Sequence, residues 1–223
     1  MIVLIYIIMD NWEYGNAKKK QKLNNDNNEE KQEDFRKNGN VKEGNISSDD
    51  NHIYFYSEVT KKTIFDLIKE IRFVTQKMLD VKRKYNIDSP PIYLHINSYG
   101  GSIFAAMASV DVIKENEVPI YTVVEGCAAS AATLMSVVGE KRFIRPNAHM
   151  LIHQLSTIFW GKMEEFDDEM KNLNRLMDLI KKIYKEHTNV PMKKISEILK
   201  HDIWWNAETC IKNGLVDDII KTI

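Results

Sequence analysis

Short apolar segments alternate with amphipathic helical segments from His52 to the end of the chain. The strand-like segments are residues 52–55, 92–96, 120–124, 142–144 and 149–152. The segments with helical character are residues 63–85, 103–115, 131–138, 163–187 and 192–200. Alternation of this kind is typical of an α/β domain with parallel strands. In such a fold, active sites gather at the carboxyl ends of the strands.

The N-terminal part of the chain has a different composition. Residues 15–51 are dominated by Asn, Lys, Asp and Glu, and their apolar residues are isolated. Such a stretch cannot bury enough apolar surface to offset the entropy lost on ordering. We therefore expect a low-complexity, disordered tail over residues 1–51 and one folded domain over residues 52–223. The apolar run over residues 1–9 is less than half of the roughly 20 residues that a membrane span needs, so we expect no stable span.

Charge and cysteine content exclude several classes of function. The formal net charge of -1 provides no electrostatic case for nucleic acid as a partner. Cys127 and Cys210 form neither a CxxC pair nor a cluster with histidine, so no metal site or disulfide framework is predicted. A reducing compartment is the expectation, and we predict a cytoplasmic location, with an organellar or virus-associated setting left open.

Two loops at strand ends are candidates for chemistry. In the first, Gly100 and Gly101 allow the backbone to approach a ligand closely, although an ordinary turn is the alternative. In the second, Ser130 follows a run of small residues and opens a helix. Free amides at a helix start can hold an oxyanion, which suits a serine nucleophile. The alternative is that Ser130 is only a preferred N-cap residue.

A nucleophilic serine needs a base and a group that orients the base. Among the six histidines, His153 ends an apolar strand and is expected near the same sheet edge as Ser130. Its alternative role is that of a hydrogen-bonded residue at a strand end, and His95 is expected to be packed inside a strand. Many acidic residues are candidates for this group, and spacing alone does not select one. Asp202 precedes Ile203 and two tryptophans, so we expect it to be partly buried, which would strengthen its hold on an imidazolium.

Four ordered segments resemble the Clp peptidase family. Residues 92–103 (IYLHINSYGGSI) resemble its strand and glycine loop, INSPGG, and residues 126–132 (GCAASAA) resemble its nucleophile loop, GQAASMGA. Residues 143–154 (FIRPNAHMLIHQ) resemble RFxLPNSRVMIHQ. Residues 202–208 (DIWWNAE) and 214–217 (GLVD) resemble the C-terminal pattern DRFLSAxEA followed by YGLVD. The resemblance extends from about His52 to the C-terminus.

This resemblance implies a fold and an activity. The fold would be crotonase-like, with a stacked parallel sheet built from ββα units and a protruding handle helix. Copies would form heptameric rings, single or stacked, around a chamber for polypeptide substrates, without metal or organic cofactor. The triad would be Ser130, His153 and Asp202, with oxyanion amides from Gly101 and Ala131. Extended substrate would pair beside the segments after Gly101 and Gln154, which implies substrate-binding roles for Ser102, Ile103, Ser156 and Thr157.

The chain departs from the family pattern at several positions. Tyr99 replaces a proline and Cys127 a glutamine, and both changes should leave the backbone amides in place. Leu155 replaces the proline after the histidine motif, which alters the strand that binds substrate. Glu115 and Glu125 occupy positions where the family usually has apolar residues that receive an AAA+ ATPase unfoldase. Charges there weaken an apolar docking pocket, so that partnership is in doubt.

Other functions remain open from the sequence. The chain could be a catalytically silent ring subunit or a specialised stand-alone processing protease. A crotonase acting on acyl-CoA shares the fold but needs no Ser-His-Asp set. A Ser-Lys peptidase would need an active-site lysine and a membrane anchor, and the sequence shows neither convincingly.

Overall fold

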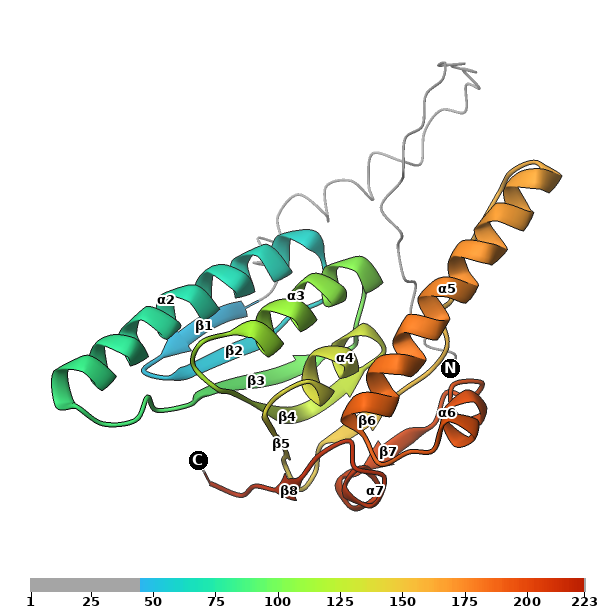
Figure 1. The fold of residues 1–223 in the computed structure, drawn as a ribbon. Helices are drawn as coiled ribbons and strands as arrows, with labels where there is room; N and C mark the ends of the chain where they lie inside the picture. Colours follow the sequence, from blue (N-terminus) through green and yellow to red (C-terminus); the bar gives the residue numbers. More distant parts are fainter. Residues whose placement is uncertain (1–44, 223) are drawn as a thin grey trace, which may run out of the picture. The chain divides into compact units, whose positions relative to one another are not determined.

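The computed structural model describes residues 45–222 and shows a mostly parallel β-sheet with helices against it (Figure 1). The strands are β1 (Asn45–Asp49), β2 (His52–Tyr56), β3 (Ile92–Ser98), β4 (Ile120–Ala129), β5 (Lys141–Ile144), β6 (His149–Leu151), β7 (Trp204–Asn206) and β8 (Asp218–Ile219). The helices are α2 (Lys61–Tyr85), α3 (Ile103–Glu115), α4 (Ala131–Val137), α5 (Met163–His187), α6 (Met192–Ile198) and α7 (Ala207–Lys212). These bounds confirm the expected alternation of strands and helices.

The boundary of the folded part differs from the expectation. We placed its start at His52, but β1 begins at Asn45 and pairs antiparallel with β2. The polar composition of this segment did not predict a strand. The segment forms one because its backbone groups pair with those of β2, and this pairing does not depend on the side chains. The rest of the expected tail, residues 1–44, lies outside the described residues.

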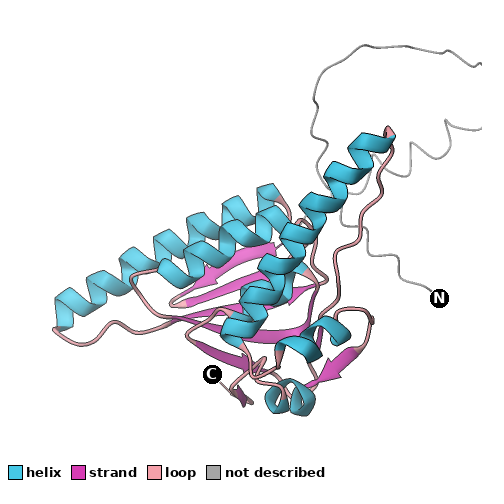
Figure 2. Ribbon diagram, turned by 45° about the vertical axis from the view of Figure 1, so that its right-hand side comes forward, coloured by secondary structure: helices cyan, strands magenta, loops and turns pink. Residues whose placement is uncertain are grey.

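The sheet has the strand order β1-β2-β3-β4-β5-β8, and all neighbouring pairs from β2 to β8 are parallel. The sheet is therefore mixed, since β1 and β7 are antiparallel to their neighbours. In both views α2, α3 and α4 lie on one side of the strands (Figures 1 and 2). Helix α4 packs on the central strands β3 and β4, which are buried along most of their length, whereas α2 packs on β1 and β2.

Strand β4 is longer than expected and, besides β3, pairs with two strands in succession. We expected a loop from Glu125 to Ala129, but β4 continues through these residues. Its first half pairs with β5, whereas residues from Cys127 to Ala129 pair with β6. Gly126 has a φ of 69° at the point where the pairing changes, a conformation that favours glycine. The extension carries the chain to Ser130 on a rigid strand rather than on a loop.

Helix α5 projects beyond the sheet (Figure 2). Of its residues only Ile180, Ile183 and Tyr184 are buried, and all three lie toward its C-terminal end. The predicted apolar stripe continues toward the N-terminal end, where Phe166 and Met170 are exposed. The helix is therefore anchored at its base, and the apolar face of its outer half stays largely exposed although Phe159 packs edge-to-face on Phe166.

Candidate active site

Ser130 has an unusual backbone conformation between β4 and α4. Its φ of 54° and ψ of -126° lie in a region that residues other than glycine rarely occupy. Its N–H donates to the Leu151 carbonyl at 2.8 Å, which ties it to the end of β6. Its hydroxyl makes no capping hydrogen bond to α4 within the described residues, so the interpretation of Ser130 as a mere N-cap is wrong. Strain of this kind is found at functional sites, where the surrounding structure maintains it.

The glycine loop packs directly against the serine. A Cβ added at Gly100 would lie 2.8 Å from Ser130 Cβ and 3.1 Å from the Ala131 nitrogen. Gly100 and Gly101 also have φ values of 99° and 142°, which side chains disfavour. Only glycine therefore allows this close approach. The contact brings the predicted oxyanion amides of Gly101 and Ala131 into one region, and Ala131 N–H is free of an intrahelical acceptor because it starts α4.

His153 follows β6 and pairs with Asp202. The Nδ1 atom of His153 lies 3.2 Å from Oδ1 of Asp202, which comes from the turn after α6. The His153 side chain is only 10% exposed, and burial lowers its pKa even though Asp202 raises it. A lowered pKa keeps the imidazole neutral near neutral pH, which is the state that a general base requires.

Asp202 is less buried than we expected. Its side chain is 78% exposed, because Ile203 and Trp204 are themselves exposed and do not cover it. The expectation of a partly buried acid is therefore wrong for the single chain. The carboxylate is placed by the turn after α6 and not by an apolar pocket.

Ser130 and His153 line the same small apolar cavity. Its walls come from α3, α4 and α5 and from the segment after β6. The lining residues are Ile103, Ser130, Ala131, Leu134, His153, Gln154, Leu155, Ile180 and Tyr184. The cavity has a volume of about 10 Å³. His153 Nε2 is buried and has no hydrogen-bond partner among the described residues, so it is not bonded to the serine hydroxyl in this state. Such bonds are often long or absent before substrate binds.

The predicted substrate-binding residues come from two segments of the chain. The Ser102 hydroxyl caps α3, its N–H donates to Val59 at 2.7 Å, and the buried Ile103 side chain lines the cavity. Ser156 and Thr157 are exposed in the extended segment between β6 and α5. Their roles toward substrate stay predictions.

The sequence did not single out Thr133 and Tyr184, which form a buried polar link beside Ser130. Thr133 Oγ1 lies 2.6 Å from the Ser130 carbonyl oxygen and 2.5 Å from the Tyr184 hydroxyl. The signal available in the sequence was weak: a threonine within the small-residue helix that follows the nucleophile loop, and a tyrosine on the apolar stripe of residues 163–187.

His95 is packed inside the sheet, as we predicted, and belongs to a separate polar cluster. Its Nδ1 atom lies 3.0 Å from Glu125, its Nε2 atom lies 2.9 Å from His52, and Arg145 donates to Glu125 at 2.9 Å. Burial raises the pKa of Glu125, but hydrogen bonds from Tyr56, Arg145 and His95 outweigh it and lower the pKa overall. Glu125 is therefore an ionised carboxylate with polar partners, and this position offers no apolar docking surface.

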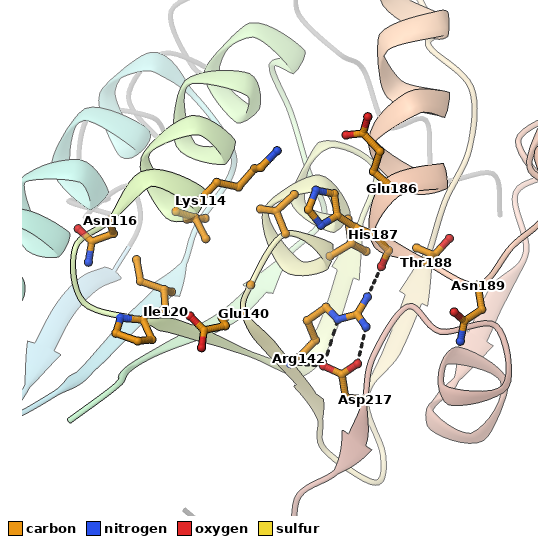
Figure 3. A pocket seen from close by; sticks show the side chains of 15 residues that line it. Lys114, Asn116, Ile120, Glu140, Arg142, Glu186, His187, Thr188, Asn189 and Asp217 are labelled. Atoms are coloured by element: carbon orange, nitrogen blue, oxygen red, sulfur yellow. Dashed lines mark hydrogen bonds and ion pairs between the residues drawn. The ribbon is translucent and has the colours of Figure 1, made fainter. Parts of the chain in front are cut away.

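A larger cavity of about 520 Å³ is lined by residues that include Arg142, His187 and Asp217 (Figure 3). Arg142 and Asp217 form an ion pair there, and Arg142 also donates to the carbonyl groups of His187 and Gly214. Because these groups satisfy one another, the cavity presents no unpaired charge from Arg142 to a ligand. Neither Ser130 nor His153 lines it.

Within residues 45–222 no group of three or more His, Cys, Asp or Glu side chains could hold a metal ion. In the same range no helix combines the length and the apolar character that crossing a membrane requires.

Comparisons with known proteins place this geometry in context. A family model described as Clp protease matches residues 44–223. The ATP-dependent Clp protease proteolytic subunit 2 of Treponema denticola is 36% identical over 133 residues, which cover 59% of this chain and 66% of that protein. The ATP-dependent Clp protease proteolytic subunit of Deinococcus radiodurans is 30% identical over 131 residues, which cover 58% of this chain and 64% of that protein. Each alignment thus spans slightly less than two thirds of the relative.

A solved structure has a similar fold. A mutant of ClpP1 from Listeria monocytogenes matches with a TM-score of 0.66 at 26% identity, over 77% of this chain and 92% of that chain.

Proposed function

The chain belongs to the Clp protease family, and from this premise we propose that it is a serine endopeptidase that cleaves polypeptides by acyl transfer. Ser130 is the nucleophile, His153 the general base and Asp202 the group that orients the base. The observation that carries the proposal is the position of His153, which contacts Asp202 through Nδ1 and shares a cavity with the strained Ser130.

The proposed mechanism uses only groups of this chain and water. The Ser130 hydroxyl attacks a peptide carbonyl while His153 Nε2 accepts its proton. The amides of Gly101 and Ala131 stabilise the oxyanion of the tetrahedral intermediate. The imidazolium then gives its proton to the leaving amine, and an acyl-enzyme remains. Water, deprotonated by His153, attacks the ester and frees the carboxylate product and the serine.

We propose that the peptidase domain covers residues 45–223, preceded by an N-terminal extension. The family match over residues 44–223 and the strand at Asn45–Asp49 support this boundary. The domain is a homo-oligomer in this proposal, as stacked rings around a chamber. The exposed apolar side chains at the outer half of α5, Met163, Phe166 and Met170, support a second copy as their partner.

Partnership with an AAA+ unfoldase is not part of the proposal. Glu125 occupies one of the positions where the family usually has apolar residues that receive an unfoldase, and Tyr56, His95 and Arg145 contact its carboxylate. An apolar segment of a partner would have to displace these polar contacts. A stand-alone processing protease is consistent with this cluster.

Labelling with a fluorophosphonate probe tests the proposal. We expect the wild-type protein to be labelled and to cleave short peptides. Ser130→Ala should lose both while it keeps its oligomeric size. Ser136→Ala is the matched control, because Ser136 is a buried serine of the same helix whose hydroxyl has no partner among the described residues. Peptide cleavage near the wild-type rate in Ser130→Ala would refute the assignment. An unlabelled, inactive wild-type oligomer would favour the silent ring subunit instead.

A further inference from the structure

A buried chain of hydrogen bonds connects helix α5 to the backbone of the nucleophile. The Tyr184 hydroxyl lies 2.5 Å from Thr133 Oγ1, and Thr133 Oγ1 lies 2.6 Å from the Ser130 carbonyl oxygen. The Thr133 N–H donates to the same carbonyl at 3.0 Å. Thr133 is 0% exposed and Tyr184 is 2% exposed, so water does not compete for these bonds.

The direction of each bond follows from the groups involved. A carbonyl oxygen only accepts, so the Thr133 hydroxyl must donate its single proton to Ser130. The Tyr184 hydroxyl must then be the donor to Thr133. Burial raises the pKa of Tyr184 above the ordinary value of a tyrosine, although the bond to Thr133 opposes the shift. The phenol therefore keeps its proton. Donors aligned in this way polarise one another and strengthen the bond at the end of the chain.

The carbonyl of Ser130 and the N–H of Ala131 belong to the same peptide group. That group is planar, and its C=O and N–H point in opposite directions when the bond is trans, as all described peptide bonds here are. Two donors on the carbonyl therefore set the direction in which the Ala131 N–H points. They also withdraw electron density from the peptide nitrogen, which makes this N–H a stronger donor.

We propose that Thr133 and Tyr184 are positioning residues that aim and polarise the Ala131 N–H toward the oxyanion of the reaction. This inference rests on the proposed peptidase function, in which Ala131 supplies an oxyanion donor. It adds that the base of α5 is mechanically tied to the donor, because Tyr184 is one of the few buried residues of that helix.

A purely structural role would give a different result. Two buried hydroxyl groups that only satisfy each other would contribute to stability, and their loss would lower the melting temperature alone. A positioning role also changes the stabilisation of the transition state, because the oxyanion forms only there. The loss then appears in kcat and not in KM.

The test compares isosteric variants. Thr133→Val and Tyr184→Phe remove one hydroxyl each and keep the packing, whereas Thr133→Ser keeps the hydroxyl. Thr122→Val is the matched control, because Thr122 is also fully buried and its hydroxyl donates to a backbone carbonyl of α4, that of Ser136, at 2.7 Å. That carbonyl is at the other end of α4, away from the oxyanion donor.

We expect Thr133→Val to lower kcat and the fluorophosphonate labelling rate by about tenfold, less than the roughly hundredfold or greater loss on removal of an oxyanion donor. KM should stay within about twofold, since ground-state binding is unchanged. Tyr184→Phe should show a smaller loss in the same direction, and the double variant should lose no more than Thr133→Val, because the two act as a unit. Thr133→Ser should retain most of the rate, and Thr122→Val should lose stability without loss of kcat.

The outcomes separate this inference from the proposed function. If the wild-type protein labels and cleaves normally while Thr133→Val and Tyr184→Phe equal it in kcat, the positioning role is overturned and the peptidase stands. The positioning role is also overturned if Thr122→Val loses as much kcat as Thr133→Val. If wild-type Ser130 does not react at all in the assembled protein, the proposed function fails and this inference fails with it. Binding of a peptide boronate tests the inference independently of turnover. If Thr133→Val binds the boronate more weakly than the wild-type protein does, while its affinity for product is unchanged, the inference is supported.

Discussion

Replacement of Asp202 by asparagine tests how His153 is held. The Asp202 carboxylate lies 3.2 Å from His153 Nδ1, while the histidine is buried and its carboxylate partner is 78% exposed. Asn keeps the size of the side chain and removes its charge. The imidazolium that forms during the reaction then has no negative partner, and the imidazole loses the group that selects its tautomer.

The magnitude follows from the distance and the exposure. Two unit charges 3.2 Å apart interact by about 1.3 kcal/mol at the dielectric constant of water. The value for water is appropriate because the carboxylate is mostly exposed and therefore screened by solvent. Loss of this energy from the transition state corresponds to about a tenfold fall in kcat. A switch of the imidazole to the wrong tautomer would add to the loss, so tenfold is the minimum that we expect.

The pH profile changes in a defined direction. Burial lowers the pKa of His153 and Asp202 raises it, so Asp202→Asn should lower the pKa further. A general base works when it is neutral, and the acidic limb of the kcat/KM profile should therefore move to lower pH in the variant.

The assay is peptide hydrolysis across a pH series, with Glu197→Gln as the control. Glu197 is an exposed carboxylate 3.7 Å from His201, and its loss should leave the rate and the acidic limb as they are. If Asp202→Asn retains the wild-type rate and an unmoved acidic limb, Asp202 does not orient His153.

Two further measurements test the packing around the site and the buried histidine. Gly100→Ala would place a Cβ 2.8 Å from Ser130 Cβ at a φ of 99°. We expect the free energy of unfolding to fall by roughly 2–4 kcal/mol from overpacking and backbone strain together. The variant should have a lower melting temperature and weaker labelling, and an unchanged melting temperature would argue against the close contact. Burial has the largest effect on the pKa of His95 and lowers it from 6.5, although Glu125 opposes the shift. The unfolded chain therefore binds more protons below about pH 6.5, and stability should fall as pH decreases through that value. His95→Gln should show a smaller fall of melting temperature with acidification, and equal slopes would exclude this contribution.

Much of the architecture was predictable because hydrophobic periodicity is a local property. The predicted helices at residues 103–115 and 163–187 have the observed bounds of α3 and α5. The errors came where pairing with a distant strand overrides local composition. The polar segment Asn45–Asp49 becomes β1 because β2 offers it a ladder, and β4 runs through Gly126 to Ala129 because β6 pairs with its end.

The site divides in the same way. Sequence motifs suggested the serine, the histidine and the acid, and the structure describes the contact between His153 and Asp202. The exposure of Asp202 could not be read from its apolar neighbours, because Ile203 and Trp204 are themselves exposed and leave the carboxylate open to solvent.

By itself the sequence determined the order and type of the main elements and the identity of the candidate reactive groups, since spacing and residue type are encoded along the chain. Only the tertiary structure decided that Gly100 lies against Ser130, and that Tyr184 reaches Thr133 across 51 positions of sequence. Contacts between distant segments depend on how the helices and strands pack, and no local pattern specifies that packing.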